Sequence, residues 1–255
     1  MARSFNGTTD IINLVASSVL DITTQLAISV WINPGGNSGT NPIVGNGAGG
    51  AGGRNFVLDM RTTQSAIEIS TGVSSSFGEM RVTGLTLNTG TWYHIAFSVD
   101  WTQVPWTGTM YLNGVSQSVS NVGAVNSGTP NASSGTRAIG ADGVNFSTIS
   151  VADIAIWKGI LLTATEALGL SKGIRPYNFR RSSLLAYWPL DGLASPEPDI
   201  SLTKDNGTLT GTALSFGPPF APFTPRWPQM IQPPPPTFQA AWARSKNIVV
   251  EGVAT

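Results

Sequence analysis

The chain has 255 residues, of which only 11% are charged, and its 14 Lys and Arg residues balance its 14 Asp and Glu residues. This balance argues against a basic surface for nucleic acid and against a polybasic patch for a membrane, so we expect neither as a partner. The absence of cysteine excludes disulfide bonds and thiolate metal sites, and the single histidine, His94, excludes a multi-histidine metal centre.

The N-terminal residues enter an expected strand at once, without a long apolar segment before it. We therefore expect neither a signal peptide nor a transmembrane helix, and we expect synthesis in a cytoplasm. If the protein acts outside the cell, we expect it to leave the cytoplasm as part of a particle or an assembly, or by cell lysis.

Apolar and polar residues alternate with a period of two in many short segments, which is the pattern of strands that bury one face. Gly, Ser, Asn and Thr separate these segments, as in β-sandwiches and jelly rolls. We expect two short strands within residues 2–15 and further strands near residues 26–32, 56–61, 66–70, 80–85, 91–99, 109–112, 137–140, 149–157 and 184–190. A small hairpin around Asn206-Gly207 is expected within residues 201–216.

The clearest part of this pattern is the stretch 91–115. Tyr93, Ile95, Phe97 and Val99 alternate with more polar or smaller residues, and the next strand ends at Asn113-Gly114. Asn-Gly is the dipeptide that a tight type I′ hairpin turn needs. The stretch therefore predicts a β-meander that continues into a strand from Val115.

The motif Trp92-Tyr93-His94-Ile95-Ala96, followed by Tyr111-Leu112-Asn113-Gly114, resembles the core of laminin-G-like, concanavalin-A-like jelly rolls. Residues 4–10, 28–32 and 149–161 continue the likeness in the order of that family, so that it covers about residues 2–175. The resemblance implies an all-β, concanavalin-A-like (laminin-G-like) jelly-roll β-sandwich. It says little about activity, because one fold hosts many functions.

One helix is expected after residue 162. Thr163 and Glu166 have the spacing of a capping box, in which each side chain accepts a hydrogen bond from the other residue's backbone N–H. Gly173 is well placed to end this helix in a left-handed conformation. A short helix at this place is again similar to laminin-G-like chains.

The chain beyond residue 216 has a different composition, with nine prolines among residues 217–236. Such a segment favours an extended polyproline II conformation and carries no core of its own. The sequence thus divides into a laminin-G-like β-sandwich, residues 1–216, and a proline-rich arm and tail, residues 217–255. We expect Pro233, Pro234, Phe238 and Trp242 to contact neighbouring subunits; packing along the chain's own sandwich is the alternative.

The sequence offers no recognisable catalytic set. Glycosidases of concanavalin-A-like fold place paired carboxylates on one strand, whereas the acidic residues here are scattered, and Glu68 has no acidic partner two or four residues away. His94 lies mid-strand and is expected to be structural, bonded to a neighbouring strand, rather than the base of a triad. We therefore expect no enzymatic activity; a hydrolase would need a carboxylate pair that folding brings together from distant strands.

No cofactor is required by the sequence, but the resemblance leaves calcium open. Laminin-G-like sandwiches often bind one Ca²⁺ at a rim through an Asp, an amide and backbone carbonyls. Asp10, Asp59, Asp100, and Asp142 near Asn145 are the candidates, although they form no clustered motif.

Trp101 and Trp106 fall in a loop between two expected strands, where burial is hard. An exposed indole face stacks on a sugar ring or anchors a protein contact, so both residues are candidate ligand-binding residues. The alternative is that they cover the end of the sandwich.

These observations lead to three classes of function. The first is a non-enzymatic structural or decoration protein of a tailed-phage virion, motivated by the expected lack of a signal peptide and of a catalytic set and by a C-terminal arm that needs a partner surface. The segment LLAYWPL at residues 184–190 and the proline-rich tail also resemble those of phage-encoded virion-associated domains. Its partners would be other virion proteins, copies of itself and host surface glycans, and it would be located in the virion. The second is a free carbohydrate-binding module, and the third is a glycoside hydrolase.

Overall fold

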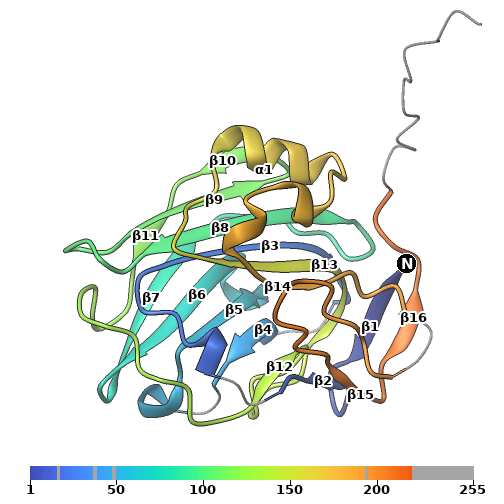
Figure 1. Ribbon diagram of the computed structural model, residues 1–255, viewed down its shortest axis with the longest axis horizontal. Helices are drawn as coiled ribbons and strands as arrows, with labels where there is room; N and C mark the ends of the chain where they lie inside the picture. Colours follow the sequence, from blue (N-terminus) through green and yellow to red (C-terminus); the bar gives the residue numbers. More distant parts are fainter. Residues whose placement is uncertain (16–17, 37–38, 48–49, 193–194, 220–255) are drawn as a thin grey trace, which may run out of the picture. The chain divides into compact units, whose positions relative to one another are not determined.

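The computed structural model describes residues 1–219 except 16–17, 37–38, 48–49 and 193–194. Two antiparallel sheets form a sandwich (Figure 1), which confirms the predicted all-β fold class. Sheet A runs in the order β10 (Val115–Gln117), β9 (Thr107–Leu112), β8 (Tyr93–Asp100), β3 (Gln25–Pro34), β13 (Thr148–Lys158), β1 (Ala2–Asn6) and β16 (Ala213–Ser215), with β14 (Leu184–Trp188) also paired to β13.

Sheet B lies on the other side of the core. Its order is β11 (Ser120–Asn121), β7 (Ser76–Val82), β6 (Ala66–Val73), β5 (Phe56–Arg61), β4 (Thr40–Asn46), β12 (Arg137–Ile139), β2 (Ile11–Asn13) and β15 (Thr208–Thr210). Short 3₁₀ helices connect the strands at η1 (Ser18–Leu20), η2 (Ala51–Gly53), η3 (Thr62–Gln64), η4 (Pro176–Asn178) and η5 (Arg181–Ser183).

The core lies between the two sheets and consists of the apolar side chains that point inward from each strand. In β5 and β6 these are Phe56, Leu58 and Met60 together with Ile67 and Ile69, all of them buried. Because successive side chains of a strand point to opposite faces, the residues between these point away from the core, onto the outer face of sheet B.

The helix α1 (Ala164–Ser171) covers the outer face of sheet A (Figure 1). Its capping box is present as predicted, with the Glu166 N–H donating to Thr163 Oγ1 at 3.3 Å and the Thr163 N–H donating to Glu166 Oε2 at 2.9 Å. Gly173 follows with φ +85°, the left-handed conformation expected of the terminating glycine. Ala167 and Leu170 seat the helix on a small second core that contains Trp157.

The meander of β8, β9 and β10 is confirmed. Asn113 and Gly114 both have positive φ, at 52° and 82°, as a type I′ turn requires. The Asn113 side chain also accepts from the His94 N–H at 2.8 Å, which ties the turn back to β8.

The predicted hairpin around Asn206-Gly207 is wrong. β15 pairs with β2 in sheet B, and β16 pairs with β1 in sheet A, so the two strands belong to different layers. The chain changes sheets between them at Gly211, whose φ is +78°. Alternation alone could not reveal this, because a short strand has the same pattern whichever sheet it joins.

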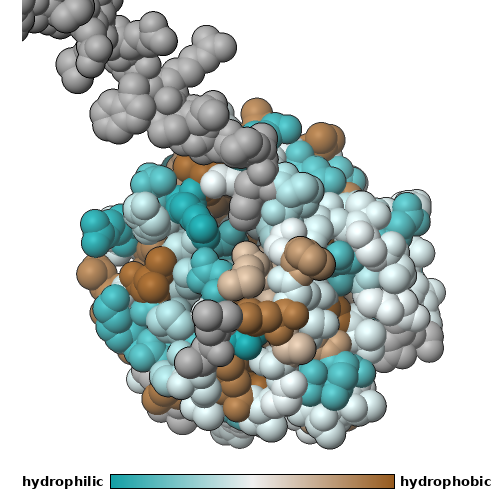
Figure 2. Space-filling view, turned by 90° about the vertical axis from the view of Figure 1, so that its right-hand side faces the viewer, coloured by the Kyte–Doolittle hydropathy of each residue, from teal (hydrophilic) through white to brown (hydrophobic). Residues whose placement is uncertain are grey.

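The side of the molecule that carries β1, β16, β2 and β15 is shown in Figure 2. Apolar residues appear there as small patches between hydrophilic ones. Single exposed apolar side chains of this kind are usual on folded domains. No helix among the described residues is long and apolar enough to cross a bilayer.

Candidate functional site: a charged depression on sheet B

Trp101 and Trp106 are not exposed, so the prediction of accessible indole faces is wrong. Their exposed fractions are 4% and 2%, and both belong to the main core. Trp106 packs against Gly78 of β7, where a Cβ would lie 2.1 Å from the indole Cζ3, and its Nε1 donates to the Gly128 carbonyl at 3.2 Å. The glycine makes room for the ring, and the two tryptophans cover the end of the sandwich.

The predicted partner-binding residues Pro233, Pro234, Phe238 and Trp242 lie outside the described residues. Their contact with neighbouring subunits stays a prediction.

Acidic residues that are far apart in the sequence meet on the outer face of sheet B. Asp59 of β5 is the register partner of Glu68 of β6, and Glu79 of β7 lies on the same face. The expectation of scattered carboxylates is therefore wrong, because the antiparallel pairing of three consecutive strands brings them together. The exposed fraction of Asp59 is 1% and that of Glu68 is 0%.

Two arginines hold this cluster together. Arg61 donates from Nε to Asp59 at 3.0 Å and from Nη2 to Glu68 at 2.7 Å. Arg81 contacts the other Glu68 oxygen and donates from Nη2 to Glu79 at 2.9 Å. Both oxygens of Glu68 are thus occupied by guanidinium groups. Glu68 is therefore compensated by two arginines, and each arginine has a second acidic partner, Asp59 or Glu79.

Burial raises the pKa of the other two carboxyl groups of the cluster, Asp59 and Glu79. Burial, followed by the neighbouring Glu68 charge, raises the pKa of Asp59 to about 8, although Arg61 and Arg54 act in the opposite direction. Burial and the Glu68 charge also raise the pKa of Glu79, against the effect of Arg81. Removal from water and a like charge both disfavour an ionised carboxylate.

Next to the cluster lies a depression with a volume of about 180 Å³. Arg54 forms one wall, with its guanidinium 5.1 Å from the centre of the Phe77 ring and 3.3 Å from Asp142. The remaining lining comes from β4, β5, β7 and the β12–β13 loop, and the full set is Thr40, Arg54, Asp59, Arg61, Phe77, Glu79, Asp142 and Asn145. The depression therefore combines an aromatic wall with carboxyl, guanidinium and amide groups.

The calcium candidates do not come together. Asp10 accepts from the Asn6 N–H, and Asp100 accepts from Gln25 and Thr102, at separate places in the fold. Asp59 and Asp142 share the depression, but each is paired with an arginine. Within the described part of the chain there is no group of three or more His, Cys, Asp or Glu residues that could hold a metal ion.

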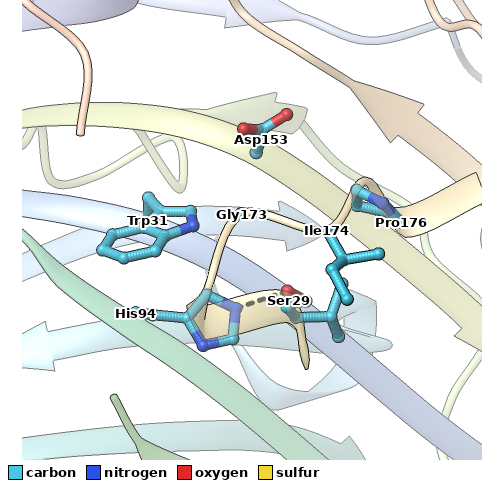
Figure 3. A pocket seen from close by; sticks show the side chains of 8 residues that line it. Ser29, Trp31, His94, Asp153, Gly173, Ile174 and Pro176 are labelled. Atoms are coloured by element: carbon cyan, nitrogen blue, oxygen red, sulfur yellow. Dashed lines mark hydrogen bonds between the residues drawn. The ribbon is translucent and has the colours of Figure 1, made fainter. Parts of the chain in front are cut away.

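His94 lies beneath α1 in a second, much smaller cavity of about 10 Å³ (Figure 3). Its Nε2 is 2.9 Å from Ser29 Oγ of β3, as expected for a structural histidine bonded to a neighbouring strand. Asp153 lines the same cavity, but its carboxylate accepts from the Tyr187 hydroxyl at 2.6 Å and from Arg175 at 2.7 Å. Ser29, His94 and Asp153 thus do not form a hydrogen-bonded triad, and the space is too small for a substrate.

We predict a pH dependence of stability from His94. Burial lowers the pKa of this residue to about 3, and it is the only histidine of the chain. The unfolded chain binds a proton near pH 6.5 while the folded chain does not, so stability is lost as the pH falls below 6.5. Because Asp59, with its raised pKa, contributes the opposite trend over this range, the effect of His94 is seen as a difference between two proteins. Between pH 6.5 and 4.5 the wild type should lose about 2–3 kcal/mol in the free energy of unfolding relative to His94→Gln, measured by urea unfolding. An identical pH dependence in both proteins would contradict this prediction.

The sequence analysis named Asp59, Asp142 and Asn145 only as calcium candidates and missed that they line one depression with Glu79, although part of the signal was present in the sequence. Pairing the core residues of the two predicted strands, Leu58 with Ile69 and Met60 with Ile67, places Asp59 opposite Glu68. The third strand was expected to begin at Met80, whereas β7 begins at Ser76 and includes Glu79. No strand pattern could predict that Asp142 and Asn145 reach the depression, because both lie in the β12–β13 loop.

Comparison with known families gives one match that covers most of the sandwich. The model of the concanavalin A-like lectin/glucanases superfamily matches residues 6–167. No curated protein matches the chain significantly.

Two solved structures share the fold. One is a Bacteroides ovatus protein described as carbohydrate-binding, with a TM-score of 0.60 and 19% identity; the match covers 87% of this chain and 62% of that one. The other is the heptameric SAP-like pentraxin of Limulus polyphemus, with a TM-score of 0.52 and 16% identity, covering 85% of this chain and 94% of the pentraxin. The chain thus spans less than two thirds of the Bacteroides protein, and at these identities the likeness extends to the fold alone.

Proposed function

The chain belongs to the concanavalin A-like lectin/glucanases superfamily, and we propose that it is a non-enzymatic carbohydrate-binding protein whose ligand occupies the depression on sheet B. The observation that carries this proposal is the lining of the depression. Phe77 supplies an apolar wall, and Asn145, Glu79 and Asp59 supply hydrogen-bonding groups around it. Sugar sites combine these two elements, since a sugar ring has apolar faces and a rim of hydroxyl groups. The Bacteroides ovatus neighbour, described as carbohydrate-binding, supports the same function.

Glycoside hydrolysis is the second candidate, and the cluster of carboxyl groups on adjacent strands favours it. The environment of Glu68 speaks against it, because both of its oxygens are held by Arg61 and Arg81 and no part of the residue is exposed. A glycosidase nucleophile or acid must reach the sugar bond. Hydrolysis of a polysaccharide by the full chain, abolished by Glu68→Gln in a protein that still folds, would establish the hydrolase and contradict the non-enzymatic proposal.

The test of binding is an oligosaccharide array probed with the full chain, followed by titration calorimetry of any sugar that binds. Glu79→Ala should weaken binding about tenfold, which corresponds to one hydrogen bond between a charged group and a hydroxyl. Glu79 Oε1 has no protein partner among the described residues, so it is available to a ligand. The control is Asp191→Ala at an exposed position away from the depression. Equal affinities of wild type and Glu79→Ala would place the sugar elsewhere.

We further propose that the sandwich is displayed on a particle, as a decoration protein of a tailed-phage virion. The supporting observation is the sequence of residues 217–255, where prolines are followed by Phe238 and Trp242 without enough apolar residues for a separate core. In this proposal the segment binds other virion proteins or further copies of the chain, and the lectin-like sandwich faces outward to surface glycans.

This display role predicts that residues 217–255 are needed for assembly and dispensable for sugar binding. The full chain and a chain of residues 1–216 should bind the same glycan with equal affinity, whereas only the full chain should associate into oligomers in native mass measurements or enter particles. Particle incorporation of the shortened chain would contradict the role given to the C-terminal segment.

A further inference from the structure

Resting on the carbohydrate-binding function proposed above, we propose that the depression selects uncharged sugar units and that the Asp59 carboxyl group, in its protonated form, donates a hydrogen bond to a ligand hydroxyl. The position of Asp59 in the depression is set by the sheet, since it lies on β5 with a neighbouring strand on each side. Its role therefore depends on which atoms remain free and on the charges around it.

The geometry leaves one oxygen of Asp59 for a ligand. Oδ1 accepts from Arg61 Nε at 3.0 Å, and Oδ2 has no hydrogen-bond partner among the described residues. The side chain is 1% exposed, yet it lines the depression. Oδ2 is not one of the fully buried side-chain atoms that lack a partner, so it keeps some contact with the depression. A ligand hydroxyl in the depression would satisfy this oxygen.

The charges that face Asp59 come from every neighbouring element. Arg61 lies on the same strand, Glu68 on β6, Glu79 and Arg81 on β7, Arg54 just before β5, and Asp142 in the β12–β13 loop. These are three arginines and, with Asp59 itself, four carboxyl groups. If all four carboxyl groups were ionised, the site would carry one excess negative charge; with Asp59 protonated, the charges cancel.

The raised pKa of Asp59, about 8, agrees with this account of the charges. At neutral pH the group is then largely a carboxylic acid, which can donate one hydrogen bond, whereas an ionised carboxylate can only accept. The pKa of Asp59 is raised by burial and by the Glu68 charge, and the strand register places Asp59 directly opposite Glu68.

The same charges disfavour an acidic sugar. Each arginine is already engaged with a carboxylate: Arg54 with Asp142, Arg61 with Glu68, and Arg81 with Glu68 and Glu79. A carboxylate or sulfate on the ligand would meet Glu79 and Asp142 without a spare cation to pair with, and like charges that lie close together repel. The volume of about 180 Å³ is below the 300–1,000 Å³ of drug-sized pockets, so it fits one or two sugar units.

The experiment uses the full chain and a panel of neutral oligosaccharides (cello-, malto-, xylo- and galacto-oligosaccharides) beside acidic ones (oligogalacturonate and sialyllactose). Affinities are measured at pH 6, 7, 8 and 9 for wild type, Asp59→Asn and the exposed control Asp191→Asn. We expect a neutral sugar to bind the wild type about tenfold more weakly at pH 9 than at pH 7, because only the protonated fraction is competent. Asp59→Asn keeps a donor that does not ionise, so its affinity should not change over this range. Asp191→Asn should behave as the wild type.

The outcomes separate the two proposals. If no member of the panel binds at any pH, or if Glu79→Ala has no effect on the sugar that binds, the carbohydrate site itself is wrong. If a sugar binds in a Glu79-dependent way but acidic members bind as well as neutral ones, or if Asp59→Asn retains the tenfold fall, the role of protonated Asp59 is wrong while the binding function stands. A folded Asp59→Asn protein, checked by circular dichroism, is the condition for each comparison; if that variant does not fold, the pH dependence of wild-type selectivity decides.

Discussion

Replacement of Glu68 by alanine is expected to lower the free energy of unfolding by about 3–5 kcal/mol. The residue is fully buried and bridges Arg61 to Arg81, so its removal leaves two guanidinium groups facing each other without the charge between them. Removing one member of a buried ion network costs this much because charge is left poorly compensated: the two arginines lose the fully buried carboxylate that they share and keep one acidic partner each, Asp59 and Glu79. Urea unfolding at pH 7, followed by tryptophan fluorescence, measures the loss.

Asp191→Ala is the control for this change, because an exposed carboxylate outside the network should alter stability by less than about 0.5 kcal/mol. A similarly small effect of Glu68→Ala would mean that solvent reaches the cluster and screens it. The proposed binding site would then lack the buried ion network that holds Asp59 and Glu79 in place beside the depression.

Trp106→Ala is expected to be as damaging, with a loss of about 3–5 kcal/mol in the free energy of unfolding. The indole is buried in the main core, fits against the bare Cα of Gly78 and donates to the Gly128 carbonyl. Alanine would leave a large cavity in that place and an unpaired carbonyl beside it. Thermal or urea unfolding of the variant measures the effect.

The matched comparison is Trp92→Ala, since Trp92 is only partly buried and packs against a small cluster with Trp31. Its replacement should cost less than that of Trp106. If Trp106→Ala were instead fully stable and lost glycan binding, the indole would be a ligand contact, and the core role given to Trp106 would be wrong.

Strands β5 and β6 show how much of the fold could be predicted from the sequence. Alternation identified both strands and their core residues, and the resemblance identified the sandwich; both are confirmed. The pairing of Asp59 with Glu68 needs one more step, the register of the hairpin, which a four-residue connection at 62–65 and the matching of core residues could have supplied. Spacing along a single strand could not show it.

Other parts of the site depend on tertiary structure that a pattern does not encode. The burial of Trp101 and Trp106 was missed because a loop between strands is expected to be exposed, whereas a glycine on β7 leaves space for one ring beneath it. Arg54, Asp142 and Asn145 reach the depression from irregular segments, and their approach depends on the packing of neighbouring strands. The assignment of β15 and β16 to opposite sheets has the same origin.

The most direct test of the carbohydrate site is a crystal structure of the full chain with the oligosaccharide that binds most tightly on the array. We expect density for a neutral sugar unit in the depression, against the Phe77 ring and within hydrogen-bond distance of Asp59 and Glu79. A sugar bound at the opposite sheet, at the edge strands or beside α1, with the depression filled only by solvent, would contradict it.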